Sequence, residues 1–147
     1  MATAKGMCYA LDIPLISVNR LTMIAYNAYL NNDQGKFDLY AALLLARPGE
    51  FFVAVYDHAF RCVISPRHII TAQLDEILLS DTRIMLVTDT ETAISSTLNA
   101  GRICISTDVK TDLKSWCFYA LEQYKCHNIE ILSSCEPFYL KQVYTHN

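Results

Sequence analysis

The sequence predicts an α/β fold in which a three-stranded antiparallel meander is followed by alternating helices and strands. Three apolar segments between residues 37 and 64 are separated by tight-turn signals, which is typical of a meander. Beyond residue 70 the apolar spacing alternates between helical and strand-like segments. The length agrees, because 147 residues, 52% of them hydrophobic and 18% charged, can bury one sizeable core.

Residues 1–34 are predicted to form an appendage that contains a short helix ending near Leu11, a buried strand Leu15–Val18 and a second helix. Asn19 is placed to cap the second helix. The apolar residues of this helix recur on one face, which needs a partner: Leu21, Ile24, Ala25, Ala28 and Tyr29. The polar run 31–36 then marks a boundary, so we expect a second unit at residues 35–147.

The meander is expected to consist of three apolar runs bounded by turn residues: Phe37–Ala46, Phe51–Tyr56 and Phe60–Ile64. The first run is long enough to be a central strand covered on both faces. Arg47–Glu50 predicts a type II turn, because Pro48 sets φ at one central position and Gly49 tolerates the positive φ of the next. Ser65-Pro66 is expected to end the third strand.

Helices and strands are expected to alternate after the meander. The first of these are a short helix with Leu74, Ile77 and Leu78, a buried strand Ile84–Val87, a helix starting near Thr90 with Ala93, Ile94 and Leu98, and a strand Ile103–Ile105. The clearest helix runs from about Thr107 to Tyr124. Its apolar stripe is predicted to be buried and consists of Val109, Leu113, Trp116, Cys117, Ala120, Leu121 and Tyr124. This order is expected of a ribonuclease-H-like layer of strands covered by helices.

Composition excludes several classes of function. The 12 basic and 15 acidic residues give a net charge of −3 without a run of like charge, so we expect no strong direct binding of nucleic acid. The longest apolar stretches, such as Leu39–Ala46, fall short of the roughly 20 residues that span a membrane. Six cysteines without paired spacing, and no signal peptide before them, indicate reduced thiols in a cytoplasmic protein.

We expect no cofactor, metal or catalytic group in this chain. The four glycines form no phosphate-binding turn, and Thr88–Glu91 is better interpreted as the cap of a helix than as a nucleotide contact. The possible metal ligands fit no zinc spacing: Cys117, Cys126, His127 and Cys135. His58 and His68 are expected in a turn and on the surface, and no nucleophile with a recognisable base stands out.

Two segments resemble the TsaB (YeaZ-like) family of tRNA-modification proteins. Glu136–Lys141, with the sequence EPFYLK, resembles the closing signature of the family, and residues 4–18 resemble the helix-turn-strand that follows its glycine-rich loop. The resemblance implies two ribonuclease-H-like halves of the kind shared with actin, sugar kinases and heat-shock ATPases. Here the second half is expected to be whole, and the first to be reduced to its last helix, strand and helix.

The closing signature is interpreted as structural. Its residues are Glu136, Pro137, Tyr139, Leu140 and Lys141, and we expect Phe138, Tyr139 and Leu140 to pin the tail into the core. Residues 45–52 resemble a second family signature, in which Leu45 replaces an aspartate while Arg47 and Glu50 are retained. The resemblance implies a polar pair, Arg47 and Glu50, that faces the cleft between the halves, with a solvated surface turn as an equal alternative.

The resemblance implies a non-catalytic scaffold subunit of the machinery that installs threonylcarbamoyl on the adenosine next to the tRNA anticodon. A TsaD-like catalytic subunit and a TsaE-like ATPase would then be its partners. The family pairs through helices of the first half, one of which corresponds to about Thr3–Leu11 here, so Lys5, Cys8 and Tyr9 are candidate interface residues.

Two other functions stay open. The first is a truncated, homo-oligomerising remnant without activity, in which Tyr9, Leu21, Ile24 and Tyr29 cover one another across a symmetry axis. The second is a glycoprotease-like peptidase, against which the lack of a recognisable metal-binding histidine pair or nucleophile counts.

Overall fold

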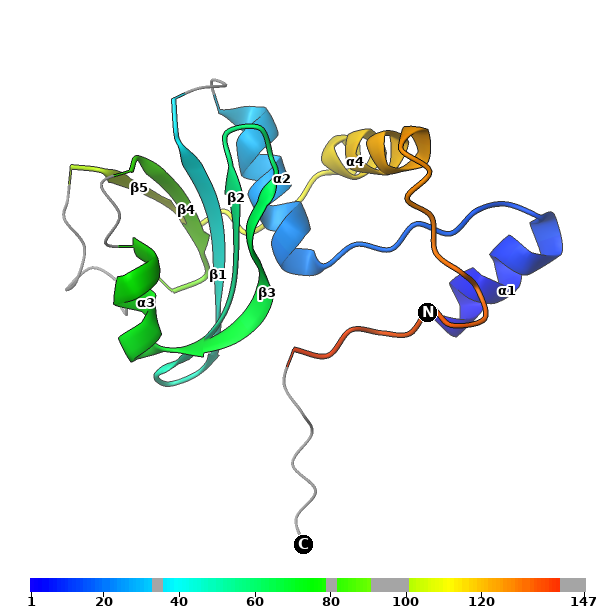
Figure 1. Cartoon of the computed structure of the whole chain (residues 1–147), viewed down its shortest axis with the longest axis horizontal. Helices are drawn as coiled ribbons and strands as arrows, with labels where there is room; N and C mark the ends of the chain where they lie inside the picture. The colour runs from blue at the N-terminus through cyan, green and yellow to red at the C-terminus, as the bar shows by residue number, and fades with distance from the viewer. Residues whose placement is uncertain (33–35, 79–81, 91–100, 141–147) are drawn as a thin grey trace, which may run out of the picture.

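The computed structural model describes residues 1–32, 36–78, 82–90 and 101–140. Within them the helices and strands follow in the order α1 (Ala2–Leu11), α2 (Arg20–Asn31), β1 (Leu39–Arg47), β2 (Glu50–Asp57), β3 (Cys62–Ile70), α3 (Thr71–Leu78), β4 (Ile84–Thr88), β5 (Ile103–Ser106) and α4 (Leu113–Lys125). The strands form one mixed sheet of order β3-β2-β1-β4-β5 (Figure 1). Strands β1, β2 and β3 pair antiparallel, whereas β4 runs parallel to β1 and to β5. The predicted meander and α/β fold class are confirmed.

Strand β1 is covered on both faces, as its apolar sequence predicts. Its side chains alternate between two hydrophobic clusters, because successive residues of a strand point to opposite faces. Tyr40, Ala42 and Leu44 face the cluster that includes α2. Ala41 and Leu43 face the cluster that includes Leu74 of α3. The sheet therefore lies between a helix on each face (Figure 1).

The apolar face of helix α2 packs against this sheet. The Asn19 side chain accepts a hydrogen bond of 2.9 Å from the Leu21 backbone N–H, which confirms the predicted cap. Leu21 and Ile24 are only 2% and 1% exposed and belong to the same cluster as β1. Their burial contradicts the hypothesis that they cover a second copy. The division into units 1–34 and 35–147 stays a prediction, with α2 lying against the sheet of the second unit.

The prediction that Ser65-Pro66 ends the third strand is wrong. Strand β3 continues to Ile70, and its pairing with β2 is irregular at this point, where Val53 lies opposite Arg67 and Val55 opposite Ile64. Two residues, 65 and 66, thus lie opposite one, which is the geometry of a bulge. Proline is tolerated there because β3 is an edge strand, so its missing N–H removes no bond from a ladder.

Two other predicted elements differ from the structure, and a third lies almost wholly outside the described residues. Leu15–Val18 is not a strand, because within the described residues Leu15 forms a single bridge, to Glu130, and no strand there continues the pairing. Helix α4 begins at Leu113 instead of Thr107, where the Asp112 side chain accepts a capping bond of 2.7 Å from the Ser115 backbone N–H. The helix predicted from Thr90, with Ala93, Ile94 and Leu98, lies almost entirely outside the described residues.

Candidate protein interface

Helix α4 is attached to α2 through polar side chains. The Tyr26 hydroxyl donates a hydrogen bond of 2.9 Å to Glu122 Oε2. The Ser115 hydroxyl donates one of 2.7 Å to Asn27 Oδ1, and the Asn27 amide donates one of 3.1 Å to the carbonyl of Lys110. Ser115 is accordingly the buried residue of this helix. The polar side of α4 therefore faces the protein.

The apolar stripe of α4 faces solvent, so its predicted burial is wrong. Leu113 is 78% exposed and Trp116 is 40% exposed. Other members, Cys117, Leu121 and Tyr124, are exposed as well, and Ala120 is half-buried. Val109 lies before the helix and does pack against the core cluster. The pattern correctly predicted an amphipathic helix, but the polar contacts to α2 decide which side is covered.

Helix α1 and residues 126–135 lie side by side beyond α4 (Figure 1). The Glu130 N–H donates a hydrogen bond of 2.8 Å to the carbonyl of Leu15, and the Ser17 hydroxyl donates to Glu130 Oε1. The Lys5 ammonium donates a bond of 3.0 Å to the carbonyl of Cys135. Residues far apart in the sequence thus form a lobe away from the sheet.

The three predicted interface residues do not share one surface. Tyr9 is 82% exposed, whereas Cys8 is buried, with its thiol 3.8 Å from the carbonyl of Pro14. Lys5 is half-buried because it binds Cys135. Lys5 and Tyr9 nevertheless line one hollow of about 620 Å³, whose other walls are Gly6, Ile131, Leu132 and Ser133. A Cβ added at Gly6 would meet no atom within 4 Å, so this part of α1 is open.

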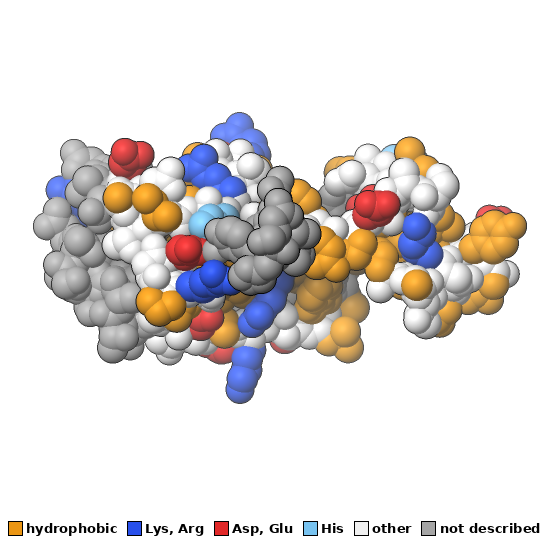
Figure 2. Space-filling model, turned by 90° about the horizontal axis from the view of Figure 1, so that it is seen from below, with side chains coloured by type: hydrophobic (Ala, Val, Ile, Leu, Met, Phe, Trp, Pro, Cys, Tyr) orange, Lys and Arg blue, Asp and Glu red, His pale blue; other side chains and the backbone are white. Residues whose placement is uncertain are grey.

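Further apolar side chains are exposed on α1 and just after it. Met7, Leu11 and Ile13 are exposed like Tyr9. Figure 2 shows hydrophobic side chains gathered at the end of the molecule that carries α1. The sequence did not single out Met7, Leu11 and Ile13. Met7 and Leu11 are four positions apart and share one side of α1, whereas Tyr9, four positions after Lys5, lies on the side of the hollow. We call Met7, Tyr9, Leu11 and Ile13 the α1 surface.

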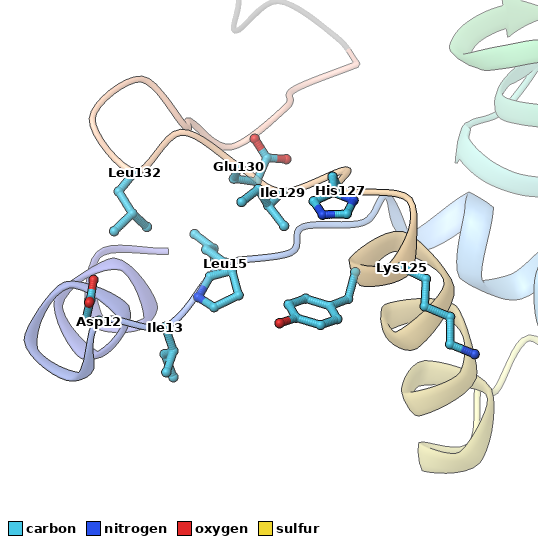
Figure 3. A pocket seen from close by; sticks show the side chains of 10 residues that line it. Asp12, Ile13, Leu15, Lys125, His127, Ile129, Glu130 and Leu132 are labelled. Atoms are coloured by element: carbon cyan, nitrogen blue, oxygen red, sulfur yellow. The ribbon is translucent and has the colours of Figure 1, made fainter.

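A second hollow, of about 560 Å³, lies between residues 12–15 and the end of α4 (Figure 3). Leu15, Ile129 and Leu132 flank it, whereas Lys125 extends away from it. Two residues with positive φ, Asp12 at 52° and His127 at 56°, turn the chain at the ends of α1 and α4. The sequence offers no glycine at either turn, although aspartate and histidine tolerate this conformation better than most residues.

The closing signature does not pin the tail through its aromatic residues. Phe138 is 71% exposed and Tyr139 is 76% exposed, which contradicts that prediction. Leu140 alone of the three packs against the core cluster. Glu136 and Pro137 line a hollow of about 440 Å³ together with residues from α2 and the sheet. Lys141 lies outside the described residues.

Arg47 and Glu50 lie opposite each other across the turn between β1 and β2. Gly49 has φ of 80°, as the predicted turn requires. Glu50 Oε2 lies 2.9 Å from His68 Nε2 on β3, so the carboxylate is held at the surface by a neighbouring strand. A role of Arg47 and Glu50 in a cleft stays a prediction.

The residues weighed for cofactor and metal chemistry have local partners. Thr88 Oγ1 accepts a bond of 3.1 Å from the Thr90 N–H, and Asp89 Oδ1 accepts one of 2.9 Å from the Leu45 N–H. Among the described residues, no three His, Cys, Asp or Glu side chains are grouped to hold a metal ion. Within the same residues, no helix is long and apolar enough to cross a membrane.

Comparison with known proteins connects this fold to one family. The sequence model described as TsaD, tRNA N6-adenosine threonylcarbamoyltransferase, matches residues 1–137. Two solved structures are similar: an uncharacterized protein with similarity to peptidase YEAZ from Pseudomonas aeruginosa, with 14% identity and a TM-score of 0.76, and YeaZ from Pseudomonas aeruginosa, with 15% and 0.74. Each match covers 95% of this chain and 65% of the solved chain. No curated protein sequence gives a significant match.

Proposed function

The chain belongs to the family described as TsaD, tRNA N6-adenosine threonylcarbamoyltransferase, and from this premise we propose that it is a non-catalytic scaffold subunit of the tRNA threonylcarbamoyladenosine machinery. The YeaZ-like fold supports the proposal. Its partners would be a TsaD-like catalytic subunit and a TsaE-like ATPase, in the cytoplasm. Because the chain has a net charge of −3, we assign tRNA contact to the partner subunits.

The observation that most supports this function is the α1 surface. Met7, Tyr9 and Leu11 are exposed apolar side chains on two different sides of α1, whereas a monomeric protein usually exposes polar residues on a surface helix. The neighbouring hollow beside Lys5 and Ile131 could receive a side chain of the partner. An exposed aromatic residue beside an apolar hollow is typical of the centre of a protein–protein interface.

The proposal is tested by mixing this chain with the TsaD-like protein of the same organism. Size-exclusion chromatography with light scattering should show a mixed complex. Tyr9→Glu should weaken it more than about tenfold, because a charge would be buried in the apolar contact. Tyr9 is 82% exposed, so the fold should survive.

Val63→Glu is the matched control, because Val63 is 55% exposed on β3, outside the α1 surface. It should leave the complex intact. Absence of a mixed complex would count against the proposal. If the complex tolerates Tyr9→Glu, the α1 surface is not the interface with the TsaD-like protein.

Among the described residues, no histidine weighed as a base lies beside a serine or cysteine nucleophile, so no geometry supports the peptidase alternative. His68, one of the histidines weighed as a base, contacts the carboxylate of Glu50 instead of a serine or cysteine nucleophile.

A further inference from the structure

We propose that the hollow beside Gly6 receives an apolar side chain of the partner protein, and that a carboxylate next to this side chain on the partner pairs with Lys5. The inference rests on the proposed function, because it names the chemistry that the TsaD-like protein presents to α1. A hollow without a charge preference would leave the proposed function intact and the inference wrong.

The glycine at position 6 is the first observation. Gly6 lies inside α1, where glycine is less favourable than alanine because it has more freedom to lose on folding. Its backbone does not have a positive φ, which Gly49 does have. Packing within the chain is not the reason either, because a Cβ at Gly6 would meet no atom within 4 Å. Nothing in the described part of the chain therefore requires glycine at this position.

A close approach from outside the chain explains this glycine. Without a Cβ, Gly6 lets another group come close to the helix backbone. The hollow of about 620 Å³ lies beside it, and Tyr9, Ile131 and Leu132 give it apolar walls. Tyr9 and Ile131 are 82% and 70% exposed at its edge. An aliphatic or aromatic side chain fits such walls, whereas a polar one would lose its hydrogen bonds to water.

Lys5 determines the charge that is favourable beside this side chain. It is the one charged residue among the ten of α1, and it lines the same hollow. Lys5 is half-buried, and its ammonium donates to the carbonyl of Cys135. Among the described residues no carboxylate forms an ion pair with it. Because an ammonium has three donors, Lys5 can bind an incoming carboxylate and keep its bond to Cys135.

The apolar walls and the single cation together specify the partner. The segment that binds here carries a leucine-like or phenylalanine-like side chain and an aspartate or glutamate next to it. A basic or wholly apolar segment would cover Lys5 without pairing it, which costs free energy as the contact forms. The hollow therefore selects among partners by charge as well as by shape.

Filling the hollow tests the apolar contact. Gly6→Leu should raise the dissociation constant of the complex with the TsaD-like protein, measured by calorimetry, more than about tenfold. The Tm of the chain alone should not fall, because leucine favours a helix and its Cβ meets no atom. Gly101→Leu is the matched control, since a Cβ at Gly101, just before β5, also meets no atom within 4 Å. It should leave the dissociation constant unchanged.

Removing the charge tests the carboxylate. Lys5→Gln keeps a donor for the carbonyl of Cys135 but has no charge, so it should weaken the complex about fivefold at low salt. The dissociation constant should also depend less on salt. Lys5→Arg should keep the affinity and its salt dependence. Lys36→Gln removes an exposed charge before β1, far along the chain from α1, and should leave both unchanged.

Cross-linking identifies the carboxylate on the partner. A carbodiimide joins an amine and a carboxylate that are in direct contact, so mass spectrometry should find Lys5 linked to an aspartate or glutamate of the TsaD-like protein. Lys5→Glu alone should weaken the complex. Lys5→Glu combined with a lysine substitution at the linked position of the partner should restore it.

Two results would overturn the inference and leave the proposed function in place. They are a complex that tolerates Gly6→Leu, and a complex whose affinity and salt dependence are the same with Lys5→Gln. Absence of any mixed complex would instead overturn the proposed function and this inference together.

Discussion

Tyrosine hydroxyl groups at single residues connect α2 to the sheet and to α4. Tyr56 is 5% exposed, and its hydroxyl lies 2.7 Å from that of Thr22 on α2. Burial raises the pKa of Tyr56 to about 12. Burial, followed by the hydrogen bond to Glu122, raises the pKa of Tyr26 as well. Both phenols are thus held in the neutral form, since ionisation within the core would leave a charge without water.

These shifts predict how stability depends on pH. A phenol whose pKa is raised on folding stabilises the fold fully below its unfolded value of 10.0, and this contribution is lost as pH rises toward about 12. The free energy of unfolding, measured with urea at a series of pH values, should therefore decline above about pH 10. Tyr56→Phe should make the decline shallower. At neutral pH it should cost about 1 kcal/mol through the lost bond to Thr22.

The control for this titration is Tyr9→Phe, because Tyr9 is 82% exposed and should leave the slope unchanged. An equally steep decline in Tyr56→Phe and the parent protein would show that Tyr56 does not ionise with unfolding.

At the scale of elements, α2 and α4 have similar apolar stripes but opposite environments. The stripe of α2 packs into the cluster with β1 and β2, where Ile24 is 1% exposed. The stripe of α4 is left outside because its other side forms hydrogen bonds to α2. The two helices are therefore expected to respond differently to truncation of an apolar side chain.

Ile24→Ala should lower the free energy of unfolding by roughly 2 to 5 kcal/mol, since it leaves a cavity in the core. Trp116→Ala should cost less than about 1 kcal/mol, because Trp116 is 40% exposed and its hydrogen bond to Thr111 lies at the surface. Urea unfolding of the two variants compares these free energies. A loss of about 3 kcal/mol or more for Trp116→Ala would show that the stripe is buried after all.

At the scale of the whole molecule, the lobe that contains the sheet and the lobe that contains α1 are stabilised by different interactions. The sheet is covered on both faces by hydrophobic clusters. Cys8 is the buried residue of α1, and the lobe of α1 and residues 126–135 is joined by bonds such as those of Lys5 and Glu130. Regions with few buried apolar contacts open at lower free energy than the core.

Native-state hydrogen exchange should therefore show α1 exchanging before the sheet opens. Amides of α1 should exchange faster than those of β1 and β4 by at least about two orders of magnitude, since local opening costs less than global unfolding. Glu130→Ala, which removes the acceptor for Ser17, should speed exchange in α1 further and leave β1 unchanged. Equal protection of α1 and β1 would mean that both lobes open as one unit.

Only part of the candidate interface could be predicted from the sequence. Tyr9 could be proposed from a family resemblance, and its exposure agrees with that role. Cys8, two positions from an open Gly6, is buried against the turn at Pro14, which depends on how the chain turns after α1. The hollows beside α1 and α4 could not be predicted, because residues 127–132 reach them only through the long-range pairing of Glu130 with Leu15.

The sequence by itself determined the elements whose signals are local. The Asn19 cap, the turn at Gly49 and the apolar runs of β1 and β4 each depend on a few neighbouring residues, and all appear where they were expected. Tertiary structure alone decided which elements acquired a partner. Pro66 stayed within a strand because that strand is at an edge, and Leu15–Val18 formed no strand because none of the described strands lies beside it. An apolar stripe specifies that a helix has two sides, but only long-range contacts decide which side is buried.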